Sequence, residues 1–281
     1  MEVEHYLDHI GLAQRPDPSA EGVAVLQLAH RQRIGFENLD VRLGRSIRID
    51  SESVFGKLVM RGRGGYCFEQ NRLFSDMLTL LGVENRPLLG RVMLGIPECV
   101  VPPRTHTLSL AQIEGRPWIA DAGFGGSFVP PLPLVHGAEA ATPDGARHRL
   151  LRVGERGSPL GEWLLERAGA VSATDGRCAP HADWQAQYVF DLSEVAQDDL
   201  EMSNHWTCTR PDTRFTSLHI ASIILPGGFA ALSERQFTLH RQGSSETRTI
   251  EDAAEYAHTL RETFRIALSD EEAAALPLFG G

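Results

Sequence analysis

The sequence of 281 residues predicts an α+β protein, because helical and strand patterns occupy separate parts of the chain. Apolar side chains recur at helical spacing in residues 1–85. From Arg86 onward, short apolar segments bounded by Pro and Gly are typical of antiparallel strands. Helical patterns return near the C-terminus, after further strands. This order does not fit the regular strand–helix alternation of a parallel sheet.

Two amphipathic segments predict the main N-terminal helices. Residues 21–34 (EGVAVLQLAHRQRI) place Val23 and Leu26 on one helical face. Residues 68–82 (FEQNRLFSDMLTLLG) repeat this spacing and close on a glycine, which suits a helix C-terminus. Residues 36–50, between the two helices, predict a loop with a short extended piece.

Three apolar segments predict the first strands of the middle region, namely residues 86–94, 105–113 and 116–124. The sequence Glu-Gly-Arg at 114–116 predicts a tight turn, so the second and third segments should pair as a hairpin. Residues 132–150 are rich in Pro, Gly and Ala and predict a loop.

The last part of the chain predicts more strands and two closing helices. Residues 149–154 and 161–168 form a candidate hairpin. A polar segment then leads to residues 215–242, where Pro-Gly-Gly predicts a strand–turn–strand unit. Residues 250–266 predict a helix, and a short final helix follows with Ser269 as its N-cap.

Composition limits the classes of function. The formal net charge is −10, and no basic stripe is present, so we expect no nucleic-acid partner. The four cysteines contain no Cys-x-x-Cys pair, so we predict reduced thiols and no metal site. The first residues lack a signal-peptide layout, and no apolar run approaches the roughly 20 residues of a membrane span. We therefore expect a cytoplasmic protein without a membrane partner.

Cys67 lies in RGGYCFEQN, residues 63–71, directly before a predicted helix. A thiol attacks as thiolate, and a thiol pKa of about 8.5 falls beside a protonated His or at a helix N-terminus. The preceding Gly64 and Gly65 would permit backbone angles that other residues resist, and would let the turn present the thiol outward. Cys67 is therefore a candidate nucleophile.

His106 and Asp121 are the candidate base and orienting carboxylate. His106 begins one strand of the predicted hairpin, and Asp121 ends the other. If His106 pairs near residue 124, the two side chains can meet at the same end of the hairpin. Taken singly, the three residues also fit a small buried thiol, a surface His and a turn-forming Asp. Spacing alone leaves both interpretations open.

Several motifs resemble those of the arylamine N-acetyltransferase family. RGGYCFEQN is the most specific, and it is joined by GFENLDVRLGR, RTHTLSL, WIADAGFGG and SNHWTCTRPDTRF in family order. The resemblance covers residues 20 to 240 and implies a Cys-His-Asp triad in a cysteine-protease-like arrangement. It also implies an N-terminal helical bundle (1–85) carrying the nucleophile, a middle β-barrel (86–195) carrying His and Asp, and a C-terminal α/β lid (196–281).

The reaction that the resemblance implies is a ping-pong transfer used in xenobiotic metabolism. Cys67 would take acetyl from acetyl-CoA as a thioester and release CoA. An arylamine, arylhydrazine or arylhydroxylamine would then attack that thioester. The soft sulfur nucleophile suits thioester exchange, which splits one transfer into two steps.

The resemblance also implies roles for residues around the triad. Phe36 and Phe124 match positions that line the aromatic acceptor pocket, although core packing explains them equally well. Thr105 would line the cleft that binds CoA, and Glu37 and Arg63 would form an ion pair that supports the Cys67 turn. A glycine turn near the CoA phosphates, which would otherwise be a plain turn, corresponds to Gly123, Gly125 and Gly126.

Some positions depart from the family pattern. Gly35 replaces the usual Pro before FENLD, His205–Trp206 replace a Trp-Tyr pair, and Cys208 and Thr213 each replace Ser. These changes lie toward the lid and the CoA cleft, so they concern acyl-donor preference rather than the triad.

Three other functions remain open. A related amide synthase of secondary metabolism would use the same triad with a carrier-bound acyl chain. A thiol hydrolase would use it to cleave amides without an amine acceptor. A binding protein without catalysis is disfavoured because all three triad residues are present.

Overall fold

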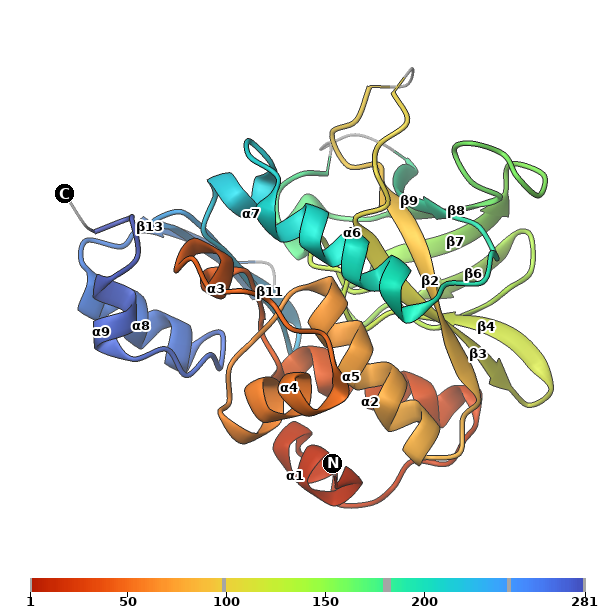
Figure 1. The fold of residues 1–281 in the computed structure, drawn as a ribbon, viewed down its shortest axis with the longest axis horizontal. Helices are drawn as coiled ribbons and strands as arrows, with labels where there is room; N and C mark the ends of the chain where they lie inside the picture. The colour runs from red at the N-terminus through yellow and green to blue at the C-terminus, as the bar shows by residue number, and fades with distance from the viewer. Residues whose placement is uncertain (1, 98–99, 179–182, 242–243, 280–281) are drawn as a thin grey trace.

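The strands of this α+β protein form two sheets, with helices grouped around them (Figure 1). The computed structural model describes residues 2–97, 100–178, 183–241 and 244–279. In the view of Figure 1, the N-terminal helices lie at the bottom, the larger sheet at the right and the smaller sheet with α8 and α9 at the left. The predicted fold class is confirmed.

The N-terminal helices pack around one apolar core. They are α1 (Val3–Ile10), α2 (Ala20–Arg33), α4 (Ser51–Phe55), the π-helix η1 (Gly56–Met60) and α5 (Cys67–Leu80). The predicted helices at 21–34 and 68–82 correspond to α2 and α5. Both helices bury the apolar faces that their spacing predicted.

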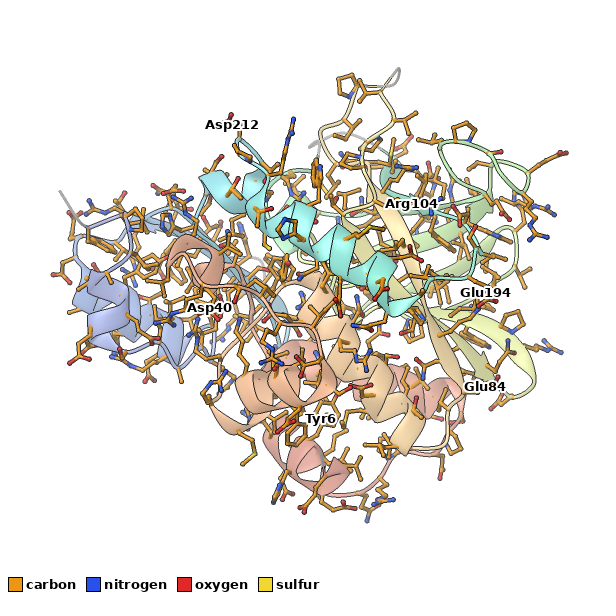
Figure 2. The ribbon with its side chains drawn as sticks, in the orientation of Figure 1. Tyr6, Asp40, Glu84, Arg104, Glu194 and Asp212 are labelled. Carbon is orange, nitrogen blue, oxygen red and sulfur yellow. The ribbon has the colours of Figure 1, made fainter. Side chains whose placement is uncertain are left out.

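A buried hydrogen-bonded chain links three of these helices. Tyr6, labelled in Figure 2, places its hydroxyl 2.8 Å from His30 Nδ1, and His30 Nε2 lies 2.6 Å from Gln70 Oε1. Gln70 Nε2 in turn donates to the carbonyl oxygen of Gly35, at 2.9 Å. Because every member is buried, the chain fixes α5 relative to α1 and α2.

The larger sheet is antiparallel and has the strand order β5-β4-β3-β2-β9-β8-β7-β6. Its edge strands β5 and β6 approach each other, so the sheet forms a nearly closed barrel. Its strands are β2 (Asn85–Val92), β3 (His106–Ile113), β4 (Arg116–Ala120), β5 (Leu132–Pro133), β6 (Ala138–Ala141), β7 (Arg147–Arg152), β8 (Trp163–Ala168) and β9 (Gln185–Phe190). A short 3-10 helix, η2 (Val171–Ala173), lies between β8 and β9.

The smaller sheet has the order β1-β10-β11-β12-β13 and joins distant parts of the chain. Its first strand comes from the N-terminal region, because Phe36 pairs with Ser222 of β10. The sheet packs against the C-terminal helices. Its strands and the remaining helices are β1 (Phe36–Glu37), β10 (Ile220–Leu225), β11 (Gly228–Ser233), β12 (Gln236–Arg241), β13 (Ser244–Thr249), α3 (Leu39–Arg42), α6 (Gln197–Thr209), α7 (Arg214–Ser217), α8 (Ala253–Glu262) and α9 (Asp270–Ala274).

The predicted turns and caps agree with the structure. Glu114 and Gly115 both have positive φ and join β3 to β4 as a two-residue hairpin loop. Gly227 has φ 68° in the turn between β10 and β11. Strands β7 and β8 pair as the second predicted hairpin. Ser269 caps α9 by accepting a hydrogen bond from the Glu272 backbone N–H.

One prediction of irregular structure was wrong, and one helix was not predicted. Residues 132–150, predicted as a loop, contain β5, β6 and the start of β7. Strand β6 (AEAA) lies at the sheet edge and is largely exposed, so it lacks the apolar alternation of a half-buried strand. The polar segment before residue 215 contains the 13-residue helix α6. This helix buries few side chains, so it shows no apolar periodicity.

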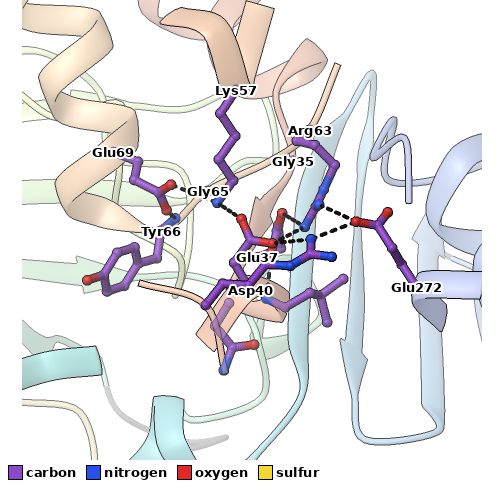
Figure 3. Close-up of polar contacts among 12 residues, drawn as sticks. Gly35, Glu37, Asp40, Lys57, Arg63, Gly65, Tyr66, Glu69 and Glu272 are labelled. Carbon is purple, nitrogen blue, oxygen red and sulfur yellow. Dashed lines mark hydrogen bonds and ion pairs between the residues drawn. The ribbon is translucent and has the colours of Figure 1, made fainter. Parts of the chain in front are cut away.

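A cluster of buried charges supports the turn before α5 (Figure 3). Arg63 Nη2 lies 3.0 Å from Glu37 Oε1 and 3.1 Å from Asp40 Oδ1. Lys57 Nζ lies 2.7 Å from both Asp40 Oδ2 and Glu69 Oε1. The ion pair expected between Glu37 and Arg63 is therefore present, within a larger network. The network also extends to α9, because Arg63 Nη1 lies 3.7 Å from Glu272 of that helix.

We expect Arg63→Ala to lower the free energy of unfolding by about 3–5 kcal/mol, because Glu37 would remain buried without its partner. Urea denaturation measures this change. The matched control is Arg48→Ala, whose ion pair with Asp50 is exposed and should contribute less than about 1 kcal/mol. Equal losses of unfolding free energy in the two variants would contradict a stabilising role of the buried network.

Candidate active site

Cys67 is the first residue of α5, and the backbone on both sides of it is held in place. Glu69 Oε2 accepts a hydrogen bond from the Tyr66 N–H at 3.1 Å, and Lys57 holds the other Glu69 oxygen. The Tyr66 hydroxyl bonds to Asn204 of α6. The thiol is therefore presented by a helix start that Glu69 of the same helix, Lys57 of η1 and Asn204 of α6 constrain.

Gly64 and Gly65 serve this turn in a different way from the one predicted. Neither has positive φ, so the expectation of unusual backbone angles is wrong. Instead, a Cβ at Gly64 would come within 2.3 Å of the Gly35 carbonyl oxygen, and one at Gly65 within 2.8 Å of Glu69 Oε2. The glycines allow the turn to pack against β1 and against the helix that it begins.

His106 and Asp121 meet as predicted, and the strand register lies within one residue of the predicted one. His106 Nε2 lies 2.7 Å from Asp121 Oδ2, and both side chains are buried. The β3–β4 ladder pairs Ile113 with Arg116 and ends at Ser109, so His106 lies beyond its last pair. Continued, this register places residue 123, not 124, opposite His106. The carboxylate still reaches the ring because it leaves the end of β4 toward β3.

The charges of the pair stabilise each other. Burial alone would lower the pKa of His106, but the Asp121 carboxylate and the Cys67 thiol raise it to about 10. Burial likewise opposes ionisation of Asp121, yet His106 and hydrogen bonds from Asn71 and Gly123 lower its pKa. An ionised carboxylate only accepts hydrogen bonds, so the Nε2 proton points at Asp121. Nδ1 is then the ring nitrogen that remains for the thiol of Cys67.

Asn71 joins the helix that begins with Cys67 to the strand that carries His106 and to Asp121, and the sequence analysis missed it. Its Nδ2 donates to the Thr107 carbonyl oxygen at 2.5 Å and to Asp121 Oδ1 at 2.9 Å. Its Oδ1 accepts from the Ala122 N–H at 2.9 Å. Asn71 lies four residues after Cys67 on α5, and therefore on the same helical face. That spacing was the signal available in the sequence.

The aromatic residues around His106 exclude water from the pair. The His106 ring lies 5.3 Å from the ring of Phe124 and 4.9 Å from that of Tyr188, measured between centroids. Phe124 and Tyr188 also contact each other, and both are buried. Tyr188 comes from β9 and was not predicted, because its strand offered only an apolar pattern.

A cleft of about 280 Å³ opens over the thiol. Cys67 and His106 line it, while Asp121 lies behind His106. The sulfur lies 3.5 Å from the Thr105 carbonyl oxygen at the cleft wall. Of the other predicted positions, the cleft is lined by Thr105, Phe36, Phe124, Gly123 and Gly125.

The glycine turn is shaped by close packing. Gly126 does not line the cleft, unlike Gly123 and Gly125. A Cβ at Gly123 would lie 2.9 Å from the Cys67 backbone, and one at Gly125 2.6 Å from the Phe36 ring. Bare backbone is therefore required beside the thiol.

The described part of the chain contains no group of three or more His, Cys, Asp or Glu side chains placed to hold a metal ion. None of its helices combines the length and apolar character of a membrane-spanning helix. Cys67, Cys178 and Cys208 are free thiols, and Cys99 lies outside the described residues.

Comparison with known proteins identifies the class. An N-acetyltransferase family model matches residues 21–273. A solved arylamine N-acetyltransferase from Salmonella typhimurium superimposes with a TM-score of 0.87 at 33% identity, covering 98% of this chain and 97% of that one. The bundle, barrel and C-terminal sheet are thus the architecture of solved members.

The sequence relatives narrow the family further. The arylamine N-acetyltransferase of Escherichia coli (strain K12) is 37% identical over 271 residues, which cover 95% of this chain and 90% of that protein. An arylamine N-acetyltransferase of Mycobacterium marinum, solved in complex with CoA, has a TM-score of 0.83 at 30% identity and covers 98% of both chains. The chain belongs to the arylamine N-acetyltransferase family of acyl-transferring enzymes.

We expect Asn71→Ala to reduce kcat for acetyl transfer to an arylamine by about 10²-fold, with a smaller change in KM. Asn71 does not line the cleft, so its loss should misplace His106 and Asp121 without removing a substrate contact. Steady-state kinetics measures both constants. Asn85→Ala is the matched control, because Asn85 makes several hydrogen bonds away from the cleft. Equal kinetic losses in both variants would contradict a positioning role.

The pKa of His106 predicts a pH-dependent stability. The pKa rises from its ordinary value of 6.5 to about 10 on folding. The stabilisation that His106 adds to the free energy of unfolding is therefore fully present below about pH 6.5. That contribution is lost as the pH rises toward 10. The stability difference between the wild type and His106→Asn should therefore narrow from about pH 6.5 to 9.5 in urea denaturation. A constant or widening difference would show that His106 does not gain its proton on folding.

Proposed function

We propose that this enzyme transfers acetyl from acetyl-CoA to aromatic nitrogen through a thioester on Cys67. The observation that carries the proposal is the geometry at one cleft. Cys67 begins α5 with its thiol toward the cleft, and His106 stands beside it with Nε2 held 2.7 Å from Asp121. This arrangement has the nucleophile, base and orienting carboxylate that acyl transfer requires.

In the first half-reaction, the Cys67 sulfur attacks the thioester carbonyl carbon while its proton is held on His106 Nδ1, because His106 is protonated at neutral pH. A new carbon–sulfur bond forms on Cys67 as the bond to the CoA sulfur breaks. His106 returns the proton to that leaving sulfur. The Asp121 carboxylate stabilises the imidazolium while His106 holds the proton.

In the second half-reaction, the same groups act in the reverse direction. The acceptor nitrogen attacks the acetyl carbon on Cys67, and His106 accepts a proton from that nitrogen. The carbon–sulfur bond to Cys67 then breaks, and His106 keeps the proton beside the released sulfur, as at the start of the cycle. The products are the acetylated amine and the free enzyme.

The size and lining of the cleft support alternating substrates. A volume of about 280 Å³ is at the lower end for ligand pockets, so donor and acceptor would occupy it in turn. Its lining includes Phe36, Phe124 and Phe215, which offer faces and edges to an aromatic ring. We therefore propose arylamines, arylhydrazines and arylhydroxylamines as acceptors.

A reducing compartment suits this chemistry. The nucleophile must remain a thiol between turnovers, and the cytoplasm keeps cysteines reduced. We accordingly propose that the enzyme acts in the cytoplasm.

We expect acetyl-CoA alone to release one equivalent of CoA and to leave a single acetyl adduct on Cys67, seen by intact mass and peptide mapping. An arylhydrazine should then discharge the adduct. Cys67→Ala should show neither step, with a loss of activity of at least about 10³-fold. Cys208→Ala is the matched control and should behave like the wild type, although its thiol is also accessible.

Two results would contradict the proposal. Acetylation of Cys208 in place of Cys67 would remove the proposed nucleophile. An unacetylated Cys67 that still reacts with a carrier-bound acyl chain would instead favour the amide synthase.

A further inference from the structure

The charged groups of the cleft all have the same sign. In a protein with a formal net charge of −10, the cleft is lined by Arg177 and Arg214, and no Asp or Glu of the described residues lines it. The rest of the lining is apolar or neutral apart from His106. A positive cleft in an acidic protein concentrates anionic ligands.

A single carboxylate holds both guanidinium groups. Asp175 Oδ2 lies 2.7 Å from Arg177 Nε and 3.3 Å from Arg214 Nη2. No other carboxylate of the described residues lies within ion-pair distance of either arginine. Two positive charges therefore share one negative charge, which leaves one positive charge at the cleft wall.

The arginine pair is anchored to the glycine turn beside the thiol. The Asp175 N–H donates to the Gly126 carbonyl oxygen at 2.9 Å, and Ser127 and Thr174 form an isolated antiparallel bridge. Arg177 thus comes from the barrel and Arg214 from α7, on the segment that continues from the loop at Asp212 (Figure 2). Both elements place a cation on the cleft that Cys67 shares.

Burial strengthens the attraction for an anion. The side chains of Arg177 and Arg214 are only 25% and 27% exposed, and that of Asp175 is 5% exposed. Burial lowers the pKa of Arg214, the neighbouring Arg177 lowers it further, and Asp175 offsets this only in part. An incoming anion would relieve this repulsion, and a guanidinium binds carboxylate or phosphate through two parallel N–H groups.

We propose that Arg177 and Arg214 form an anion-binding subsite of the cleft, which takes a CoA phosphate or the carboxylate of an aromatic acceptor. The inference rests on the proposed function, which places both ligands in this cleft. Asp175 is a positioning residue, because it orients the two cations and leaves their outer N–H groups toward the ligand. The competing explanation is a purely structural clasp between α7 and the barrel.

The test uses the double variant Arg177→Gln/Arg214→Gln with two matched ligand pairs. For the donor, the rate of Cys67 acetylation by acetyl-CoA is compared with that by S-acetyl-N-acetylcysteamine, which lacks the phosphates. For the acceptor, kcat/KM for 4-aminobenzoate is compared with that for its methyl ester. Arg149→Gln is the control, because Arg149 is similarly buried and pairs with Glu166 away from the cleft.

We expect one charged ligand to lose about tenfold or more in the double variant while its neutral partner changes less than about twofold. Loss confined to acetyl-CoA assigns the site to phosphate, and loss confined to 4-aminobenzoate assigns it to carboxylate. Equal losses for charged and neutral partners would support the structural clasp and overturn the proposal, as would no loss in either pair.

Two further measurements keep the test decisive. The first is calorimetric titration of CoA and 4-aminobenzoate into the wild type and the double variant, which measures the affinity of each ligand. Because binding does not require acetylation of Cys67, failure of the proposed reaction is distinguishable from failure of the subsite. If the double variant does not fold, the wild type is titrated with benzoate, benzamide and pyrophosphate. Tighter binding of an anion than of benzamide supports the subsite, and weaker binding of both anions overturns it.

Discussion

The buried carboxylate of Asp121 is the constraint on which the site depends. A charge removed from water needs partners on every side, and Asp121 finds them in His106, Asn71 and the Gly123 N–H. These partners belong to β3, to α5 and to the turn after β4. Satisfying one carboxylate therefore brings the N-terminal helices against the barrel, and the same helix carries Cys67. The contacts that pack α5 against the barrel are therefore the same contacts that place His106 and Asp121 beside Cys67.

On the opposite side of α5, several buried charges likewise need partners, and they find them in one another. Glu69 holds the backbone before Cys67, and it is tied through Lys57 to Asp40 and Arg63. Buried ion pairs are weak sources of stability, but each member is costly to leave alone. The network thus favours a single arrangement of the turn. It extends to α9, so the C-terminal helices contribute to the surroundings of the nucleophile from a distance.

The cleft shows how a local charge can differ from the charge of the whole protein. The acidic surface would repel an anionic donor, whereas the cleft wall carries two guanidinium groups and a glycine turn of bare backbone. In the reaction proposed here, donor and acceptor meet the same thiol in turn. A positive wall beside an aromatic lining provides contacts for both kinds of ligand without a separate pocket for each.

The sequence by itself determined the α+β class, the main helices and the β3–β4 hairpin, because these depend on periodicity and turn chemistry. Its motifs also indicated Cys67, His106 and Asp121 as site residues, through their resemblance to a known family. Only the tertiary structure brought Asn71, Tyr188, Arg177 and Arg214 to the site, because they come from elements far apart in the chain. It also revealed β6 and α6, whose exposed faces carry no apolar period, and showed that Gly64 and Gly65 serve close packing. Local pattern encodes which element forms, whereas long-range packing decides which side chains meet, because burial and charge are satisfied only between elements.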